Sequence, residues 1–305
     1  TAGLQEGIIS PNTGIYDKGT FKDAGKPYAR CWIGSGSGSH GNVNVSEALE
    51  VSCNYFFYTV AYRMNKGAGD LSGINTLNKY MEAFGLNSPT GVEISELYDS
   101  MSQYPTHISS PEYKKYITQQ RDVEAKESDY KWSAGDTIRT AIGQSYNNYT
   151  SALMSKYVAT LANGGTRYSM HFLNKITTND GKIEEEYQPK VESKIEIKKE
   201  NLDAIFRGMF LVTTGPRGTL RSYFKDFPVN VAAKSGTAQQ SSKRSEHTTF
   251  VAFAPLEDPQ ISVCVIIPFG NGTTGPAPKV AKAAISEYLK LDYESELKSY
   301  DTLLH

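Results

Sequence analysis

Ala233-Lys-Ser-Gly-Thr-Ala-Gln239 lies at the end of one apolar run, and Phe250-Val-Ala-Phe-Ala-Pro255 lies in the next, after a polar loop. Runs rich in β-branched and aromatic residues, separated by turn residues, are typical of antiparallel strands. The pattern predicts strands over residues 229–234, 248–253 and 260–267. A helix is expected over 278–291, because one apolar series recurs at helical spacing and would face a sheet: Val280, Ala281, Ala284, Ile285, Tyr288 and Leu289.

The sequence before residue 166 has the pattern of helices. Asn44 followed by Glu47 has the form of a capping box at a helix start. Further helices are expected over 55–64, over 74–84 with Gly85 as the C-cap, and over 151–162, while 97–135 is expected to form loop and short helix. Helices followed by strands and a final helix predict an α+β fold, with helices packed on an antiparallel sheet.

Length and composition limit the classes of protein to consider. The chain has 305 residues and a formal net charge of −1, with 21% charged and 39% hydrophobic residues, as in an ordinary globular protein. Because no basic block is present, composition gives no support to nucleic-acid binding. No apolar run approaches the roughly 18–20 residues of a membrane span. The first residue is Thr1 rather than methionine, so we expect a longer gene product that holds any membrane anchor.

Two short elements have the residue types of a serine acyl-transfer site. Ser52-Cys53-Asn54 falls at a helix junction, and Lys234-Ser235-Gly236-Thr237 ends a predicted strand. Taken singly, the first reads as a turn that caps a helix, and the second as an edge strand with a solubilising lysine. Together and in this order they match the second and third motifs of penicillin-binding proteins and class A β-lactamases, Ser-Asp-Asn and Lys-Thr-Gly. Cys53 replaces the middle Asp, and Ser235 replaces the Thr.

The wider sequence resembles the class B penicillin-binding proteins over most of the chain, and the elongation-type enzymes in particular. The segments that carry the resemblance are Gly41 to Tyr58, Phe84-Gly-Leu86, Thr90-Gly-Val-Glu-Ile94, Ala141-Ile-Gly-Gln144 and Leu161-Ala-Asn-Gly-Gly165, with the two strand segments quoted first. The resemblance implies the transpeptidase fold, in which an antiparallel sheet is flanked by helices and accompanied by a helical subdomain. Residues 1–305 would form most of one transpeptidase domain.

The resemblance also implies a peptidoglycan D,D-transpeptidase that cross-links stem peptides through a serine acyl-enzyme and is acylated by β-lactams. The first motif of the family, Ser-x-x-Lys, is not found upstream of Ser52. We therefore expect the nucleophile and its lysine base before Thr1. Ser52 would relay a proton to the leaving amine, and Asn54 would orient the lysine and bind the substrate amide. Lys234 would supply positive charge to the site.

The remaining family roles concern substrate binding. The Ser235 and Thr237 hydroxyls would bind the terminal carboxylate of the stem peptide, and Gly236 would let its backbone approach the strand. The Thr237 N–H would form half of an oxyanion hole. No cofactor is implied for the chemistry. The implied setting is the extracytoplasmic face of the bacterial plasma membrane, in a membrane-anchored parent chain that works with cell-wall elongation or division proteins and sustains cell shape.

Cys31, His40 and Cys53 form a second constellation. Two thiolates and an imidazole are a zinc ligand set, to which Asp, Glu, His or water could add a fourth ligand. The spacing fits no standard zinc finger. Since Cys53 lies inside the second motif, a structural zinc would fix the position of its neighbours. The alternatives are two reduced buried cysteines with a loop histidine, or a Cys31–Cys53 disulfide, which requires Cα atoms within about 7 Å.

Two other readings share the observations. A serine β-lactamase or β-lactam sensor has the same motifs, but it needs a deacylating base, and no loop with a clear glutamate for that task lies between them. A catalytically inert scaffold that binds wall peptides is the second reading, against which the intact Ser52, Asn54 and Lys234 argue. His247 is expected to start a strand, half-exposed and not catalytic, and Cys264 is interpreted as a small residue in the core.

Overall fold

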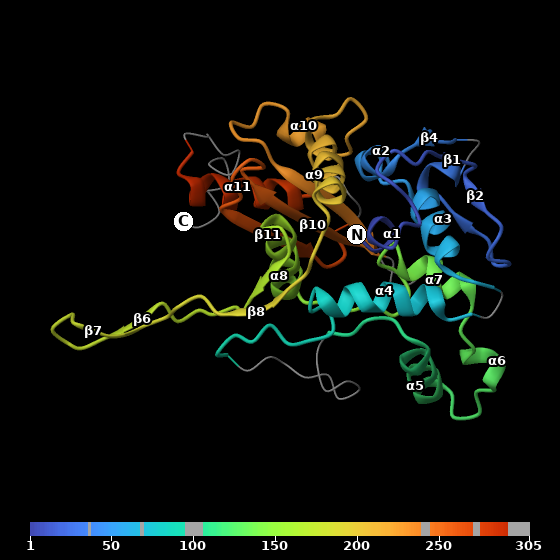
Figure 1. Cartoon of the computed structure of the whole chain (residues 1–305), viewed down its shortest axis with the longest axis horizontal. Coiled ribbons are helices and arrows are strands. Elements are labelled where there is room, and N and C mark those ends of the chain that lie inside the picture. The colour runs from blue at the N-terminus through green and yellow to red at the C-terminus, as the bar shows by residue number, and fades with distance from the viewer. Residues whose placement is uncertain (36–37, 68–69, 95–105, 239–244, 271–274, 292–305) are drawn as a thin grey trace.

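The computed structural model describes residues 1–35, 38–67, 70–94, 106–238, 245–270 and 275–291 (Figure 1). Within these residues, three strands from the second half of the chain form an antiparallel sheet with the order β11-β10-β9. The three strands are β9 (Ala232–Ala238), β10 (His247–Ala254) and β11 (Ile261–Ile267). Helices flank the sheet on both faces (Figure 1), so the predicted α+β class is confirmed.

Alternate residues of β10 pack into two separate hydrophobic clusters, because successive side chains of a strand point to opposite faces of the sheet. Phe250 and Ala252 pack in a cluster with α11 (Ala277–Leu289), whereas Phe253 packs in the larger cluster that contains the N-terminal helices. The sheet therefore joins both halves of the core. Its strand β9 forms one edge, because β10 is the only strand paired with it among the described residues.

Several helices before the sheet agree with the predicted ranges. They are α2 (Val45–Glu50), which begins at the Asn44–Glu47 capping box, α3 (Asn54–Met64), α4 (Ser72–Ala83) and α8 (Ser151–Ala162). Four more are short: α1 (Ala2–Gln5), α6 (Glu127–Tyr130), α7 (Ala134–Thr140) and α10 (Arg221–Phe224). Among the described residues, no helix combines the length and apolar character that a membrane crossing requires.

Two helices were not anticipated in full. Within the segment predicted as loop and short helix, α5 (Pro111–Arg121) has 11 residues and starts at Ser110, whose side chain caps Tyr113 N–H. Its buried side chains are only Lys114 and Ile117, so the apolar stripe was too thin to detect. The helix α9 (Lys199–Thr214) was missed, and it packs between α2 and β9. Residues 97–105 of the predicted loop lie outside the described residues.

The strand prediction for β9 was shifted. The strand begins at Ala232 rather than at 229, and it includes Lys234–Thr237, which were predicted to end it. The motif belongs to the ladder because each of its residues pairs with a residue of β10, from Lys234 with Val251 to Thr237 with Thr248. Cys264 in β11 is only half-buried, so its assignment to the core was wrong.

The prediction for the last helix was half right. Ala281 and Ile285 are fully buried against the sheet, whereas Val280 is 44% and Tyr288 is 59% exposed. Neighbouring positions on a helix differ by about 100° in direction. A second apolar series one residue out of step therefore points away from the sheet.

Small strand pairs complete the fold. Near the N-terminus, β1 (Ile15–Asp17) pairs with β4 (Gly41–Val43), β2 (Thr20–Phe21) pairs with β3 (Ala29–Arg30), and the 3₁₀ helix η1 (Trp32–Ser35) follows. Between α8 and α9 the chain forms a long arm that projects from the body (Figure 1). The arm is built from β5 (Thr166–Tyr168) paired with β8 (Val191–Lys194), and β6 (Lys175–Thr177) paired with β7 (Ile183–Glu186).

Candidate active site

The turn between α2 and α3 holds Ser52 in a left-handed conformation. Ser52 has φ 54°, a region that L-residues other than Asn and Asp seldom occupy. The Ser52 N–H donates to Leu49 O (3.2 Å) and the Cys53 N–H donates to Ala48 O (2.9 Å). These two bonds define a Schellman motif, in which glycine is the preferred residue at the position of Ser52. Residues in such sparsely populated conformations are concentrated at functional sites.

Ser52 lies against the third motif. Lys234 Nζ, from β9, donates to Ser52 Oγ at 2.9 Å and to the carbonyl of Ser235 at 2.7 Å. Burial lowers the pKa of Lys234 to about 8, because the charged ammonium has lost water. The two predicted motifs therefore meet, and the structure places the lysine charge beside the serine hydroxyl.

The other residues of the two motifs lie around this contact. Asn54 is half-buried at the start of α3, and its side chain makes no hydrogen bond to any described residue. Ser235 is buried, with its hydroxyl 3.3 Å from Thr219 Oγ1, and Thr237 is half-buried. Thr219 was not predicted, since it lies in a loop 16 positions from its partner.

Gly236 has a packing role besides the predicted one. A Cβ at this position would collide with the Thr249 hydroxyl on the neighbouring strand β10. The side chain of Thr249 therefore already fills one side of the glycine. A larger residue here would force the Thr249 side chain to move, whether or not a ligand is bound.

The outer edge of β9 presents backbone groups to the site. The Ser235 carbonyl accepts from Lys234 Nζ, and the Thr237 carbonyl accepts from Gln144 Nε2 at 3.3 Å. Both carbonyls thus point away from β10. In an antiparallel ladder the N–H of a residue points to the same side as its C=O, so the Thr237 N–H also faces this edge. Gln144 was quoted above only within a resembling segment, and its contact with β9 was not foreseen.

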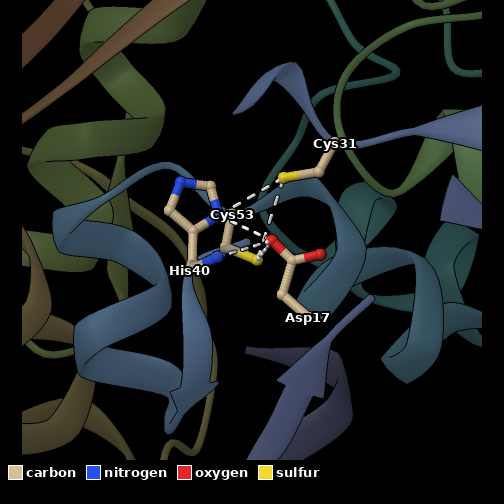
Figure 2. Close-up of side chains that lie close together, drawn as sticks. All are labelled: Asp17, Cys31, His40 and Cys53. Carbon is tan, nitrogen blue, oxygen red and sulfur yellow. Dashed lines mark hydrogen bonds and ion pairs between the residues drawn. The ribbon is translucent and has the colours of Figure 1, made fainter. Parts of the chain in front are cut away.

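Four side chains with metal-binding atoms converge at Cys53, the middle residue of the second motif (Figure 2). The predicted Cys31, His40 and Cys53 come together, and Asp17 from β1 joins them, with one ligand atom from each within 4.8 Å of the others. Asp17, Cys31 and Cys53 are buried, and His40 is partly buried. Asp17 had no spacing signal in the sequence, because the pairing of β1 with β4 is what brings it to His40.

Three distances in this cluster resemble those of a tetrahedral zinc site, whereas the 2.7 Å between His40 Nδ1 and Asp17 Oδ2 is that of a direct hydrogen bond. With Zn–S of about 2.3 Å and Zn–N of about 2.0–2.1 Å, tetrahedral ligands lie about 3.8 Å apart for two sulfurs and about 3.5 Å apart for sulfur and nitrogen. The Sγ atoms of Cys31 and Cys53 are 4.0 Å apart, and Cys31 Sγ is 3.5 Å from His40 Nδ1. Cys53 Sγ is 3.6 Å from Asp17 Oδ2. Cys31 and Cys53 are free thiols here rather than the disulfide considered above.

The charges of the cluster are coupled. The side-chain contact between the two thiols lowers the pKa of Cys31 to about 6 and raises that of Cys53. Burial opposes ionisation of Asp17, yet hydrogen bonds from the Gly19 N–H and from His40 hold its pKa below the usual value. His40 Nδ1 and Asp17 Oδ2 are 2.7 Å apart, and His40 Nε2 is buried without a partner among the described residues. Such a set of soft and hard donors suits zinc.

His247 agrees with its prediction. It is the first residue of β10 and is half-buried, and its Nδ1 accepts the N–H of Phe269 at 3.0 Å. No described contact links His247 to Ser52 or Lys234. Its position at the strand start fits a structural role.

Comparisons with known proteins agree with this geometry. A family model described as the penicillin binding protein transpeptidase domain matches residues 1–287. The chain is 32% identical over 304 residues to the peptidoglycan D,D-transpeptidase MrdA of Escherichia coli K12, covering 94% of this chain and 43% of that protein. It is 26% identical over 311 residues to penicillin-binding protein 2B of Streptococcus pneumoniae D39, covering 95% of this chain and 42% of that one.

Among solved structures, the PBP2 of Pseudomonas aeruginosa in complex with WCK 5153 superimposes with a TM-score of 0.73 at 28% identity. The match covers 96% of this chain and 59% of that one. The chain thus spans less than half of the length of the curated relatives named here.

Proposed function

The chain belongs to the penicillin-binding protein transpeptidase family, and from this membership we propose that it supplies the catalytic region of a peptidoglycan D,D-transpeptidase. The observation that supports the proposal most directly is the bond from Lys234 Nζ to Ser52 Oγ, which unites the second and third motifs. The domain would extend over residues 1–305. The serine that forms the acyl-enzyme, and its lysine base, would belong to a Ser-x-x-Lys segment preceding Thr1 in the parent protein.

The reaction uses the edge of β9 as a template. A stem peptide that adds to this edge as a strand gains main-chain hydrogen bonds, and its scissile carbonyl then lies over the Thr237 N–H, half of the oxyanion hole. Lys234 and the hydroxyls of Ser235 and Thr237 hold the terminal carboxylate. Attack by the serine forms an ester and expels D-alanine, and an amine of a second stem then takes the acyl group and restores the serine.

Ser52 and Asn54 prepare the proton transfers. The Ser52 hydroxyl accepts from Lys234, so its own proton can be donated toward the expected lysine base or the leaving amine. Lys234, whose pKa is lowered to about 8, remains mostly cationic at neutral pH. Asn54, with a side chain that makes no hydrogen bond to a described residue, would bind the substrate amide.

We also propose a structural zinc bound by Asp17, Cys31, His40 and Cys53. The match of the three distances above to tetrahedral zinc and the buried donor set support it. Cys53 lies between Ser52 and Asn54, so a closed four-ligand site would fix both motif residues in position. The chemistry itself needs no cofactor, and the metal would act through the folding of the turn.

The cellular location and the partners follow from the same proposal. A transpeptidase of this class acts on the wall outside the cytoplasm, so the parent protein would be membrane-anchored at the extracytoplasmic face of the plasma membrane. Its partners would be stem peptides, β-lactams and the proteins of wall elongation or division. Inhibition by β-lactams would also make it a point at which antibiotic resistance can arise.

Acylation tests the function. Protein that carries this chain and the expected Ser-x-x-Lys segment is treated with labelled penicillin, and its intact mass is measured. One stable adduct per molecule is expected, with slower acylation in the Ser52→Ala and Lys234→Ala variants. Absence of an adduct would reject the transpeptidase and favour the scaffold reading, whereas rapid turnover of penicillin would favour a β-lactamase.

A further inference from the structure

Gln144 lies on a strained turn between two residues with left-handed backbones. Gly143 has φ 81° and Ser145 has φ 74°. Glycine adopts this conformation readily, but serine does so at a cost. Residues kept in such conformations are concentrated at ligand-binding and catalytic sites. The strain at Ser145 therefore indicates that the position of Gln144 matters.

The backbone of this turn is fixed on both sides of Gln144. Its N–H donates to Arg139 O at 3.1 Å, and its carbonyl accepts from Asn147 Nδ2 at 3.3 Å. Asn147 is itself held, because its Oδ1 accepts from the Ser109 N–H at 2.9 Å. The side chain of Gln144, which is half-buried, is consequently the part that can move.

The side chain reaches the edge of β9. Gln144 Nε2 donates to the Thr237 carbonyl at 3.3 Å, and this carbonyl faces away from β10. A peptide that joins β9 as a strand needs the same carbonyl as an acceptor for its own N–H. A carbonyl oxygen can accept two hydrogen bonds, but the Gln144 amide already occupies the open side of β9 from which the peptide N–H must approach, so the two compete for this position.

We propose that the Gln144 side chain is a displaceable gate on β9. In the free site its amide occupies the Thr237 carbonyl, which keeps this open edge from pairing with other strands. A ligand with a backbone-like N–H displaces the amide and takes over the carbonyl, whereas a ligand without this donor leaves the gate in place. The gate rests on the proposed function, since it concerns which acyl donors the same site accepts.

Two β-lactams separate the cases. Benzylpenicillin carries an acylamino N–H that can bond to Thr237 O, while penicillanic acid carries only hydrogen at that ring carbon and has no donor there. The second-order rate of acylation is measured for both compounds with wild-type protein and with Gln144→Ala, in the chain that includes the expected Ser-x-x-Lys segment. Because one hydrogen bond no longer has to be broken, Gln144→Ala should be acylated about two- to tenfold faster by benzylpenicillin. The rate with penicillanic acid should be unchanged.

A matched control and a structural measurement complete the test. Gln120→Ala removes an exposed amide from α5 and should change neither rate. In the crystal structure of the benzylpenicillin adduct, the Gln144 amide should have left Thr237 O, and in the penicillanic acid adduct it should remain. An equal effect on both compounds, or slower acylation by benzylpenicillin, would overturn the gate while wild-type acylation upholds the function. No acylation of the wild type would overturn the function and the gate together.

Discussion

Lys234 Nζ and Ser52 Oγ are 2.9 Å apart although 182 positions separate them in the chain. The contact joins the sheet to the turn between α2 and α3, and so connects the two parts of the core. A charged lysine at this point has lost part of its hydration, which is why its pKa is lowered to about 8. The site therefore contains a cation whose charge is lost in a pH range that can be measured.

The first prediction concerns that charge. Acylation by an anionic β-lactam should fall as the pH rises through about 8, because a lysine with a lowered pKa becomes neutral there and no longer attracts the ligand carboxylate. Rates measured from pH 6 to 10 check this. In Lys234→Arg the alkaline decline should vanish, since a guanidinium stays charged over the range. A decline that persists in Lys234→Arg would assign it to another group.

The second prediction separates strain from function at Ser52, which has φ 54°. Ser52→Gly and Ser52→Ala both lose the hydroxyl that accepts from Lys234, and both should be acylated far more slowly. Ser52→Gly should nevertheless be more stable than Ser52→Ala by about 1 kcal/mol, because only glycine occupies the left-handed region without cost. Urea unfolding of the two variants gives the difference. Equal stabilities would mean that the turn is not strained.

The parts of the site predicted from the sequence are those whose residues have a local signature. Lys234-Ser-Gly-Thr237 and Ser52-Cys-Asn54 could be recognised because each is a contiguous motif. Cys31, His40 and Cys53 could be grouped because cysteine and histidine are rare in this chain, with 3 and 5 copies. Residue type alone was sufficient in both cases.

Asp17 and Gln144 could not be found in the same way. The chain has 33 acidic residues, and only the pairing of β1 with β4 selects Asp17 as the neighbour of His40. Gln144 reaches the site because a turn at the end of α7 brings it to a strand 93 positions later. The exposed Val280 and Tyr288 show the converse, since an apolar spacing can recur without facing the core.

The third prediction concerns the metal. Purified protein never exposed to a chelator should contain about one zinc per chain, as a closed four-ligand site requires. Asp17→Asn and Cys31→Ser should lower the zinc content and the melting temperature, because binding of a structural metal stabilises the folded state. Cys264→Ser removes a thiol that lies in β11, outside the cluster, and should keep the metal. Protein without zinc by elemental analysis would contradict the proposal.

The fourth prediction concerns the base of the arm, where one carboxylate pairs with two cations. Glu192 in β8 accepts from Lys156 Nζ at 2.8 and 2.9 Å and pairs with Arg167 Nε at 2.9 Å. Lys156, whose side chain is 6% exposed, also donates to Thr90 O at 3.0 Å. Arg167 donates to the last carbonyls of α4, those of Glu82 and Ala83. The carboxylate thus ties the arm to α8 and α4.

Removing this carboxylate should destabilise the fold more than breaking a surface ion pair does, because the buried Lys156 would keep its charge without a counter-ion. Glu192→Gln is expected to lower the free energy of unfolding by about 3 kcal/mol, measured by urea denaturation. Hydrogen exchange should also rise in β5 and β8, since the arm then depends on its backbone ladder alone. Glu184→Gln, on the exposed strand β7, is the matched control and should change stability by less than about 0.5 kcal/mol. If both variants have the same stability, Lys156 must be neutralised in some other way, and the ion pair does not hold the arm.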